Sequence, residues 1–382
     1  MCSSILAVYF KMFKSRVNKR VRVAYPCRVC VQDVLWGEDG IQCDGCSSWF
    51  HVGCIQMSKA CYQSFSSNSH YQFFCRTCGF ETSGCYNFSG SLLRIRAKSP
   101  DINAMQQQAR SEQHLLTFYG IALPPIRDVS IEHITVDENS VSLLETHSQW
   151  LMGKYVPALV EGDGNCFFRS VSLALFGSEN YHPQLRLLAS IEALTNKELY
   201  DCDGADFYTP FRVDDRLVLP GFELFITDLV KDKSAVDMLA VLCTSCVVQK
   251  PIQTMWPVDI HEDEPPPLTK LVVGRGVQTV NPLNILWTVS SFYTGPVADI
   301  NHFAPLIERP SLIKVVEQVA VADAQNEEDD FEMDTVENEP MEIDAVGGKE
   351  IDKFLPVKTL ISLLSDTSTD SVPEIPKYII LL

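Results

Sequence analysis

The chain has 382 residues, of which 46% are apolar, and its 49 acidic and 31 basic residues give a net charge of −18. This length exceeds one ordinary domain, and the apolar content excludes a wholly disordered chain, so we expect two or three units. The longest apolar runs, such as 5–10 and 238–243, are far shorter than the roughly 20 residues of a membrane-spanning helix, which excludes a membrane protein. The run 5–10 precedes the basic cluster, the wrong order for a secretory signal, so we expect the 14 cysteines to be reduced thiols or metal ligands.

The two ends of the chain carry opposite charge. Residues 1–23 hold no acid and are expected to form a flexible basic arm, with five bases in 14–22. No aromatic residues are interleaved with these bases and no base-reading helix accompanies them, so a nuclear localisation signal is favoured over a specific nucleic-acid ligand, with a cytoplasmic location as the alternative. Residues 323–352 hold 13 acids and one base. We therefore expect 311–382 to be an acidic, largely disordered tail.

Four pairs of metal-ligand residues follow the basic arm, and the members of each pair are two residues apart. The pairs are Cys27/Cys30, Cys43/Cys46, His51/Cys54 and Cys75/Cys78. Eight such ligands complete two closed tetrahedral zinc sites, which predicts structural zinc and no catalytic metal. A segment this small is expected to need the metal in order to fold.

The order of the ligands, with Trp49 two residues before His51, resembles a plant homeodomain (PHD) finger over residues 24–81. The resemblance implies a cross-braced arrangement. One zinc would be held by Cys27, Cys30, His51 and Cys54, and the other by Cys43, Cys46, Cys75 and Cys78.

Some fingers of this family bind a histone tail and enclose a methylated lysine in an aromatic cage through cation–π attraction. Trp36 and Trp49 match two positions where such fingers carry aromatic residues. Three acids are candidates for contacting basic residues of the tail: Glu38, Asp39 and Asp44. The alternative is that Trp49 is a core packing residue and that Trp36 is a surface aromatic or a packing residue.

Residues 82–147 are expected to form a linker, and within 99–149 the polar composition predicts a helix followed by an extended connection. Residues 148–310 have the apolar periodicity of a compact domain. Helices are predicted at 166–176, 183–199, 222–230 and 235–243. Strands are predicted at 247–255, 270–273, 283–289 and 303–307, so the domain is expected to be α+β.

A candidate nucleophile, Cys166, lies where a glycine-rich turn opens into a predicted helix. A helix N-terminus stabilises a thiolate and lowers its pKa, and backbone N–H groups near Gly164 and Asn165 can hold an oxyanion. A cysteine at a helix start is more often structural, so the hypothesis also requires a general base. His302 at the start of a strand is the better candidate base, and His261 in a proline-rich loop is its rival.

Two motifs, GDGNCFFR at 162–169 and NHF at 301–303, together resemble the ovarian tumour (OTU) family of papain-like cysteine proteases over 148–308. The resemblance implies Cys166 as nucleophile, His302 as general base and then acid, and Asp163 as the acidic residue of the motif. The implied reaction is attack of the thiolate on the carbonyl at the C-terminus of ubiquitin, release of the lysine amine, and hydrolysis of the thioester.

One residue departs from the OTU pattern. Many members carry Asn or Asp two residues after the histidine, where it orients the imidazole, but this chain has Ala304. Either Asn301 or Asp163 takes over that task, or the activity is weak or absent.

The sequence therefore predicts a multidomain chain: a small two-zinc PHD finger, an α+β papain-like OTU domain, and a disordered acidic tail. The expected function is that of a deubiquitinase directed to chromatin. The alternative is an inactive OTU-like scaffold in a transposon-derived nuclear protein. Chains that combine such a finger with such a protease domain also resemble vertnin-like proteins and proteins carried by transposons. Expected partners are ubiquitin or a polyubiquitinated protein and a methylated histone tail. The only expected cofactors are two structural zinc ions.

Overall fold

The computed structural model describes residues 25–200, 221–257, 269–279, 281–290 and 301–310, and the backbone of 379–380. The predicted basic arm, the loop with His261 and the predicted acidic tail, apart from 379–380, lie outside the described residues. No described helix is long and apolar enough to cross a membrane.

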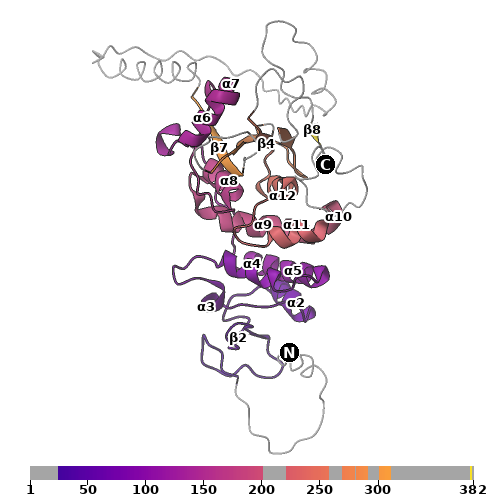
Figure 1. Cartoon of the computed structure of the whole chain (residues 1–382). Coiled ribbons are helices and arrows are strands. Elements are labelled where there is room, and N and C mark those ends of the chain that lie inside the picture. Colours follow the sequence, from indigo (N-terminus) through magenta and orange to yellow (C-terminus); the bar gives the residue numbers. More distant parts are fainter. Residues whose placement is uncertain are drawn as a thin grey trace, which may run out of the picture. The chain divides into compact units, whose positions relative to one another are not determined.

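The N-terminal segment is built around a short hairpin and a cluster of aromatic rings (Figure 1). Its regular elements are β1 (Gly40–Gln42), β2 (Trp49–His51), α2 (Lys59–Ser67) and α3 (Arg76–Gly79). Phe73 meets Phe50 and Phe65 edge to face, with ring centroids 6.3 and 5.9 Å apart. These few rings and the ligand cysteines make a small core, which agrees with a segment that needs metal to fold.

Two helices, α4 (Phe88–Arg96) and α5 (Ile102–Phe118), occupy the first half of the predicted linker. Helix α5 contributes to two apolar clusters: Leu115 belongs to the cluster of the N-terminal segment, whereas Met105 and Leu116 belong to the larger cluster of the following domain. The expected extended connection begins after α5, because 121–130 contains no regular element.

A buried ion pair joins α4 to α5. Arg94 Nε lies 2.7 Å from Glu112 Oε1, and the Glu112 side chain is fully buried. Gln108 donates a further hydrogen bond of 2.8 Å to the same carboxylate. Because a buried charge is stable only with such partners, this polar cluster favours one packing of the two helices.

The second domain is a sheet with helices on both faces (Figure 1). Its helices are α6 (Glu138–His147), α7 (Gln149–Met152), α8 (Cys166–Phe176), α9 (His182–Thr195), α10 (Lys197–Tyr200), α11 (Phe222–Leu229) and α12 (Met238–Val248). Its strands are β3 (Tyr155–Pro157), β4 (Ile252–Met255), β5 (Lys270–Val272), β6 (Leu283–Thr288), β7 (His302–Glu308) and β8 (Ile379–Ile380), in the order β3-β7-β6-β4-β5-β8.

The alternation of side chains along β7 assigns its two faces. Phe303 belongs to the main core, which contains α8, α9 and α12, and Leu306 belongs to a smaller cluster with residues of α6 and α7. His302 lies an even number of residues from Leu306 and therefore shares the face that α6 and α7 cover. Strand β6 runs antiparallel beside β7, with Thr288 opposite His302.

The α+β prediction is confirmed, and α8 has the predicted bounds. The predicted end of the last helix is wrong: α12 continues to Val248, five residues beyond 243, and β4 starts only at Ile252. Helix α12 is buried on all sides, so no polar face marks its end, and the branched Val247 and Val248 imitate a strand. Its termination depends on Gln249, whose φ of 52° is left-handed.

Candidate active site and zinc sites

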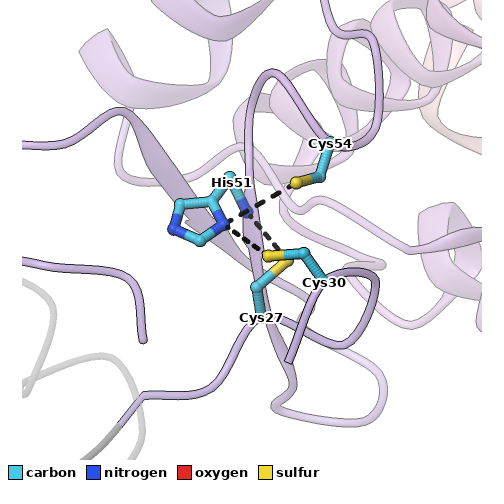
Figure 2. Close-up of side chains that lie close together, drawn as sticks. All are labelled: Cys27, Cys30, His51 and Cys54. Atoms are coloured by element: carbon cyan, nitrogen blue, oxygen red, sulfur yellow. Dashed lines mark hydrogen bonds between the residues drawn. The ribbon is translucent and has the colours of Figure 1, made fainter. Parts of the chain in front are cut away.

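The first zinc site brings together Cys27, Cys30, His51 and Cys54 (Figure 2), whose ligand atoms all lie within 4.8 Å of one another. His51 Nδ1 lies 3.3 Å from Cys30 Sγ and 3.7 Å from Cys54 Sγ. Tetrahedral zinc with the usual bond lengths places its ligand atoms about 3.5–3.8 Å apart. The arrangement therefore fits zinc.

The second site combines Cys43, Cys46, Cys75 and Cys78, again within 4.8 Å. Cys46 Sγ and Cys75 Sγ are 3.8 Å apart, the edge expected of a zinc tetrahedron. The two sites alternate along the sequence, so the cross-braced arrangement is confirmed. Both are closed sets of protein ligands, which suits structural zinc.

Glu38 orients the histidine ligand. Its carboxylate lies 3.3 Å from His51 Nε2 and also accepts a 2.8 Å hydrogen bond from the Leu35 N–H. A proton held on Nε2 leaves Nδ1 as the metal ligand, so Glu38 selects the tautomer that zinc needs.

The other candidate histone-tail residues differ in exposure. Asp44 accepts a 2.7 Å hydrogen bond from the Phe73 N–H, and burial raises the pKa of its carboxyl group. Asp39 is exposed, as is Trp36, of whose surface 78% is accessible. Trp49 instead packs on Tyr25, with ring centroids 5.3 Å apart. Trp36 and Asp39 are therefore the open members of the predicted tail-binding set.

Cys166 begins α8 and is buried, with 6% of its surface exposed. Burial raises the pKa of its thiol, while hydrogen bonds from the backbone of Phe303 and Phe167 act in the opposite direction. The sequence predicts a lowered pKa from the helix N-terminus, and this expectation is wrong because desolvation outweighs the N–H groups. The bond from Phe303 nevertheless places Cys166 beside the strand that begins with His302.

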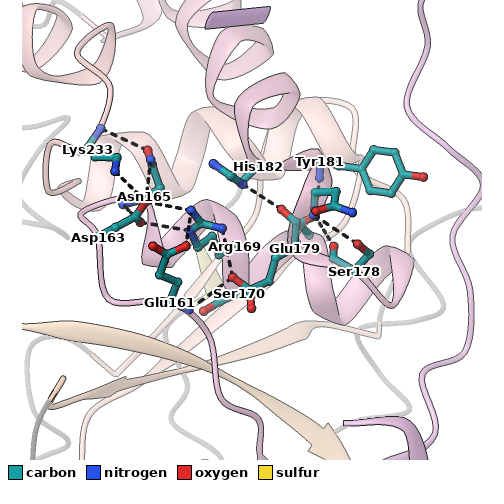
Figure 3. A network of polar contacts seen from close by, with 12 residues as sticks. Glu161, Asp163, Asn165, Arg169, Ser170, Ser178, Glu179, Tyr181, His182 and Lys233 are labelled. Atoms are coloured by element: carbon teal, nitrogen blue, oxygen red, sulfur yellow. Dashed lines mark hydrogen bonds and ion pairs between the residues drawn. The ribbon is translucent and has the colours of Figure 1, made fainter. Parts of the chain in front are cut away.

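Asp163 shapes the loop before the cysteine (Figure 3). It accepts hydrogen bonds of 3.0 and 2.8 Å from Arg169 and one of 3.0 Å from the Asn165 N–H. Burial raises the pKa of Asp163, but the arginine and the hydrogen bonds prevail and hold it well below its usual range. Arg169 also contacts Glu161 at 2.8 Å and Glu179 at 3.2 Å, so one guanidinium ties three carboxylates together.

A second loop, 231–234, covers the loop that precedes Cys166. Gly164 has a φ of +80°, and a Cβ there would lie 2.2 Å from the Lys233 carbonyl oxygen. Asn165 donates a 2.9 Å hydrogen bond to Asp232. The sequence motif thus needs glycine at this position because the two backbones touch.

Arg186, which the sequence does not single out as a site residue, holds these two loops. It is fully buried and donates to four backbone carbonyls, those of Gly164, Leu229, Lys231 and Ser234, at 2.7–3.1 Å. Burial lowers its pKa to about 10. An arginine between leucines in a buried helix is the signal that could have identified it.

His302 is 3% exposed, and its Nδ1 has no hydrogen-bond partner among the described residues. A Cβ on Gly162 would lie 3.7 Å from that Nδ1, so the open nitrogen faces the loop before Cys166. Burial lowers the pKa of His302, opposed by the charge of Asp137 and a hydrogen bond to the Val160 backbone. The imidazole is therefore neutral near pH 7 and able to accept a proton.

The two predicted substitutes for an orienting residue have other partners. Asn301 Oδ1 accepts a 3.2 Å hydrogen bond from the Ser290 N–H, and Asp163 is engaged by Arg169. Ala304 is fully buried opposite Leu286. Orientation of His302 must depend on other groups.

The comparisons with known proteins agree with two regions of this architecture. Residues 24–82 match the family model for the Pygopus PHD-type zinc finger, and 157–209 match the model for the vertnin OTU domain. The second match includes Cys166 but ends before His302. No relative was found among the curated proteins.

Several solved OTU domains resemble the chain. The viral OTU protease from Dera Ghazi Khan virus is 18% identical, with a TM-score of 0.27 over 42% of this chain and 85% of its own. The OTUD1 OTU domain is 16% identical, with a TM-score of 0.30 over 44% of this chain and 98% of its own. The Hazara virus OTU bound to ubiquitin is 14% identical, with a TM-score of 0.24 over 42% and 86%. This chain thus carries a PHD-type zinc finger followed by an OTU-like fold.

Proposed function

We propose that the OTU-like domain hydrolyses isopeptide bonds at the C-terminus of ubiquitin, with Cys166 as nucleophile and His302 as base. The observation that carries this proposal is the open, buried Nδ1 of His302, which faces the loop before Cys166. The backbone of the next residue, Phe303, lowers the pKa of the Cys166 thiol and accepts a 3.1 Å hydrogen bond from Ser170 on the same helix as Cys166. Base and nucleophile thus lie at one strand end.

The resting pair is a neutral thiol and a neutral imidazole, because burial raises the pKa of Cys166 and lowers that of His302. As Sγ attacks the substrate carbonyl carbon, Nδ1 takes the thiol proton. Collapse of the tetrahedral intermediate breaks the C–N bond, and the imidazolium returns that proton to the departing lysine amine. Water then hydrolyses the thioester, with His302 again taking a proton.

The oxyanion is held by backbone N–H groups around Gly164 and Cys166, because the Asn165 N–H already bonds Asp163. The Asn165 side chain does not cap α8; it bonds Asp232 instead, which leaves the first-turn N–H groups to the oxyanion. The contact of Gly164 with Lys233 holds this turn in place.

Reaction with ubiquitin that carries a C-terminal electrophile tests the proposal. We expect the zinc-loaded full chain to form one ubiquitin adduct, on Cys166, and Cys166→Ala to form none. Cys85→Ala, which removes an exposed thiol outside the OTU-like fold, is the matched control and should react normally. A folded protein without an adduct on Cys166 would support the alternative, an inactive OTU-like scaffold, which Ala304 favours.

We also propose that the finger binds a lysine-methylated histone tail and directs the protein to chromatin in the nucleus. The exposed Trp36 and Asp39 support this part, and so does the basic cluster in 14–22. Calorimetry should show tighter binding of a methylated than of an unmodified histone peptide, with the difference lost in Trp36→Ala. Trp150→Ala, at an exposed position outside the finger, is the control. Equal affinity for both peptides would refute the cage.

A further inference from the structure

The sheet face that carries His302 has no polar residue next to the histidine on its own strand. Ala304 is the next residue of β7 on that face and is fully buried. This face packs against α6 and α7, so a polar side chain that acts on the imidazole in addition to the Val160 backbone comes from those helices or from neighbouring β6.

Helix α6 begins with a buried polar cluster. Asp137, its N-cap residue, is 2% exposed and accepts a hydrogen bond of 3.2 Å from the Asn139 N–H. Its other oxygen accepts a hydrogen bond of 2.5 Å from the Ser140 hydroxyl. Ser140 Oγ in turn lies 2.7 Å from Thr288 Oγ1, and Thr288 is the residue of β6 opposite His302.

The donors in this chain of contacts have one possible order. A carboxylate only accepts, so Ser140 gives its single hydroxyl proton to Asp137. Thr288 must then donate to Ser140, which leaves the lone pairs of Thr288 Oγ1 as acceptors on the residue opposite His302. The three side chains polarise one another in the direction that favours positive charge on His302.

Asp137 has no ion-pair partner in the part of the chain that the structure describes. A buried carboxylate without a cation is costly, and protonation of His302 would supply that cation. The charge of Asp137 raises the pKa of His302, against the larger lowering by burial. Glu179 and Asp163 act in the same direction, but both already bind Arg169.

We infer that Asp137, acting through Ser140 and Thr288, is the positioning residue for His302 in place of the residue that Ala304 lacks. The imidazolium formed when His302 takes the Cys166 proton is stabilised by this buried carboxylate on the face of the sheet that α6 covers. The inference rests on the proposed function for its catalytic consequence. The effect of Asp137 on the pKa of His302 does not depend on whether the protein hydrolyses ubiquitin.

A purely structural role for Asp137, that of a helix cap, accounts for its bond to Asn139. Asparagine caps a helix as well as aspartate does. The variant Asp137→Asn therefore keeps the cap, but it removes the charge and puts an NH2 donor where an oxygen accepts from Ser140. Asp101→Asn makes the same change at the N-cap of α5, outside the OTU-like fold, and is the matched control.

Two readouts test the inference. NMR titration of the imidazole, assigned with His302→Gln, should show a lower His302 pKa in Asp137→Asn than in the wild type, and no change in Asp101→Asn. With a fluorogenic ubiquitin amide, Asp137→Asn should reduce kcat by about 10- to 100-fold with little change in KM. This is less than the roughly 10⁴-fold loss known for a carboxylate in direct contact with its histidine. The acid limb of kcat/KM should move to lower pH, because the base is deprotonated at lower pH.

The outcomes separate the two proposals. An unchanged His302 pKa and an unchanged kcat in folded Asp137→Asn would overturn the inference, whether or not the wild type is active. A lowered His302 pKa in a chain that does not hydrolyse ubiquitin would support it and reject the proposed function. If Asp137→Asn does not fold, the variant Ser140→Ala is the test. It keeps the Asp137 carboxylate but breaks the link from Asp137 to Thr288. A normal kcat in this variant would refute the action of Asp137 through Ser140 and Thr288.

Discussion

In the finger, all eight metal ligands come from one stretch between Cys27 and Cys78, whereas the proposed active-site groups of the OTU-like domain come from positions as distant as Asp137, Cys166 and His302. The finger has a small core of aromatic rings and ligand sulfurs, and the OTU-like domain has a continuous apolar core. Geometry in the finger is therefore set by metal bonds, and geometry in the OTU-like domain by the packing of helices on both faces of a sheet. The two sites should respond differently to the same disturbance.

Removal of zinc is the largest expected effect and separates the two regions. Structural zinc contributes about 10–16 kcal/mol to small zinc domains, so a strong chelator should unfold the finger. The fluorescence of Trp36 and Trp49 should change as zinc is released, while Cys166 should still react with the ubiquitin electrophile. If the finger unfolds and Cys166 stops reacting at the same chelator concentration, the active site depends on the finger, through α5.

Replacement of Arg186 has the converse effect. Arg186→Met keeps the apolar stem but leaves four buried or partly buried carbonyls without their donor, so we expect a loss of about 3–5 kcal/mol in the free energy of unfolding. Denaturant unfolding and Cys166 labelling should both be impaired, with zinc content unchanged. Arg275→Met, at a half-exposed arginine paired with Glu192, is the control and should cost far less.

Replacement of Glu38 weakens the zinc site without removing a ligand. Glu38→Gln gives up the charge that holds the proton on His51 Nε2, and zinc affinity should fall by about 10-fold or more. Competition with a chromogenic chelator measures the affinity. Asp39→Gln is the neighbouring control; an equal loss there would assign the effect to overall charge.

The smallest expected effect is a difference between thiols in alkylation. Burial raises the pKa of Cys166, so at a given pH it holds less thiolate than an ordinary thiol. Exposed Cys85 should react with iodoacetamide first as the pH rises, and Cys166 only at higher pH. Peptide mass spectrometry across a pH series follows both. A Cys166 that reacts at lower pH than Cys85 would indicate a resting thiolate, contrary to the neutral pair.

The zinc sites could be predicted from the sequence because a tight turn with two intervening residues carries its own geometry, and the cross-braced pairing is confirmed. The position of Cys166 at the start of α8 also follows from a local motif. Asp137 could not be found in this way. A capping residue indicates where a helix begins, but the link to His302 depends on the register of β6 with β7 and on the packing of α6 against that sheet. The end of α12 could not be predicted either, because a helix buried on all sides has no alternation of apolar and polar residues that stops where the helix ends.

Turnover of an isopeptide substrate tests the central claim most directly. The zinc-loaded full chain would be incubated with ubiquitin joined through its C-terminus to the lysine of a fluorescent peptide, and release of the peptide followed by polarisation. The account predicts multiple turnovers by the wild type, and none by Cys166→Ala or His302→Gln. An isopeptide that stays intact with a folded wild type would contradict it, and so would equal hydrolysis by the His302→Gln variant.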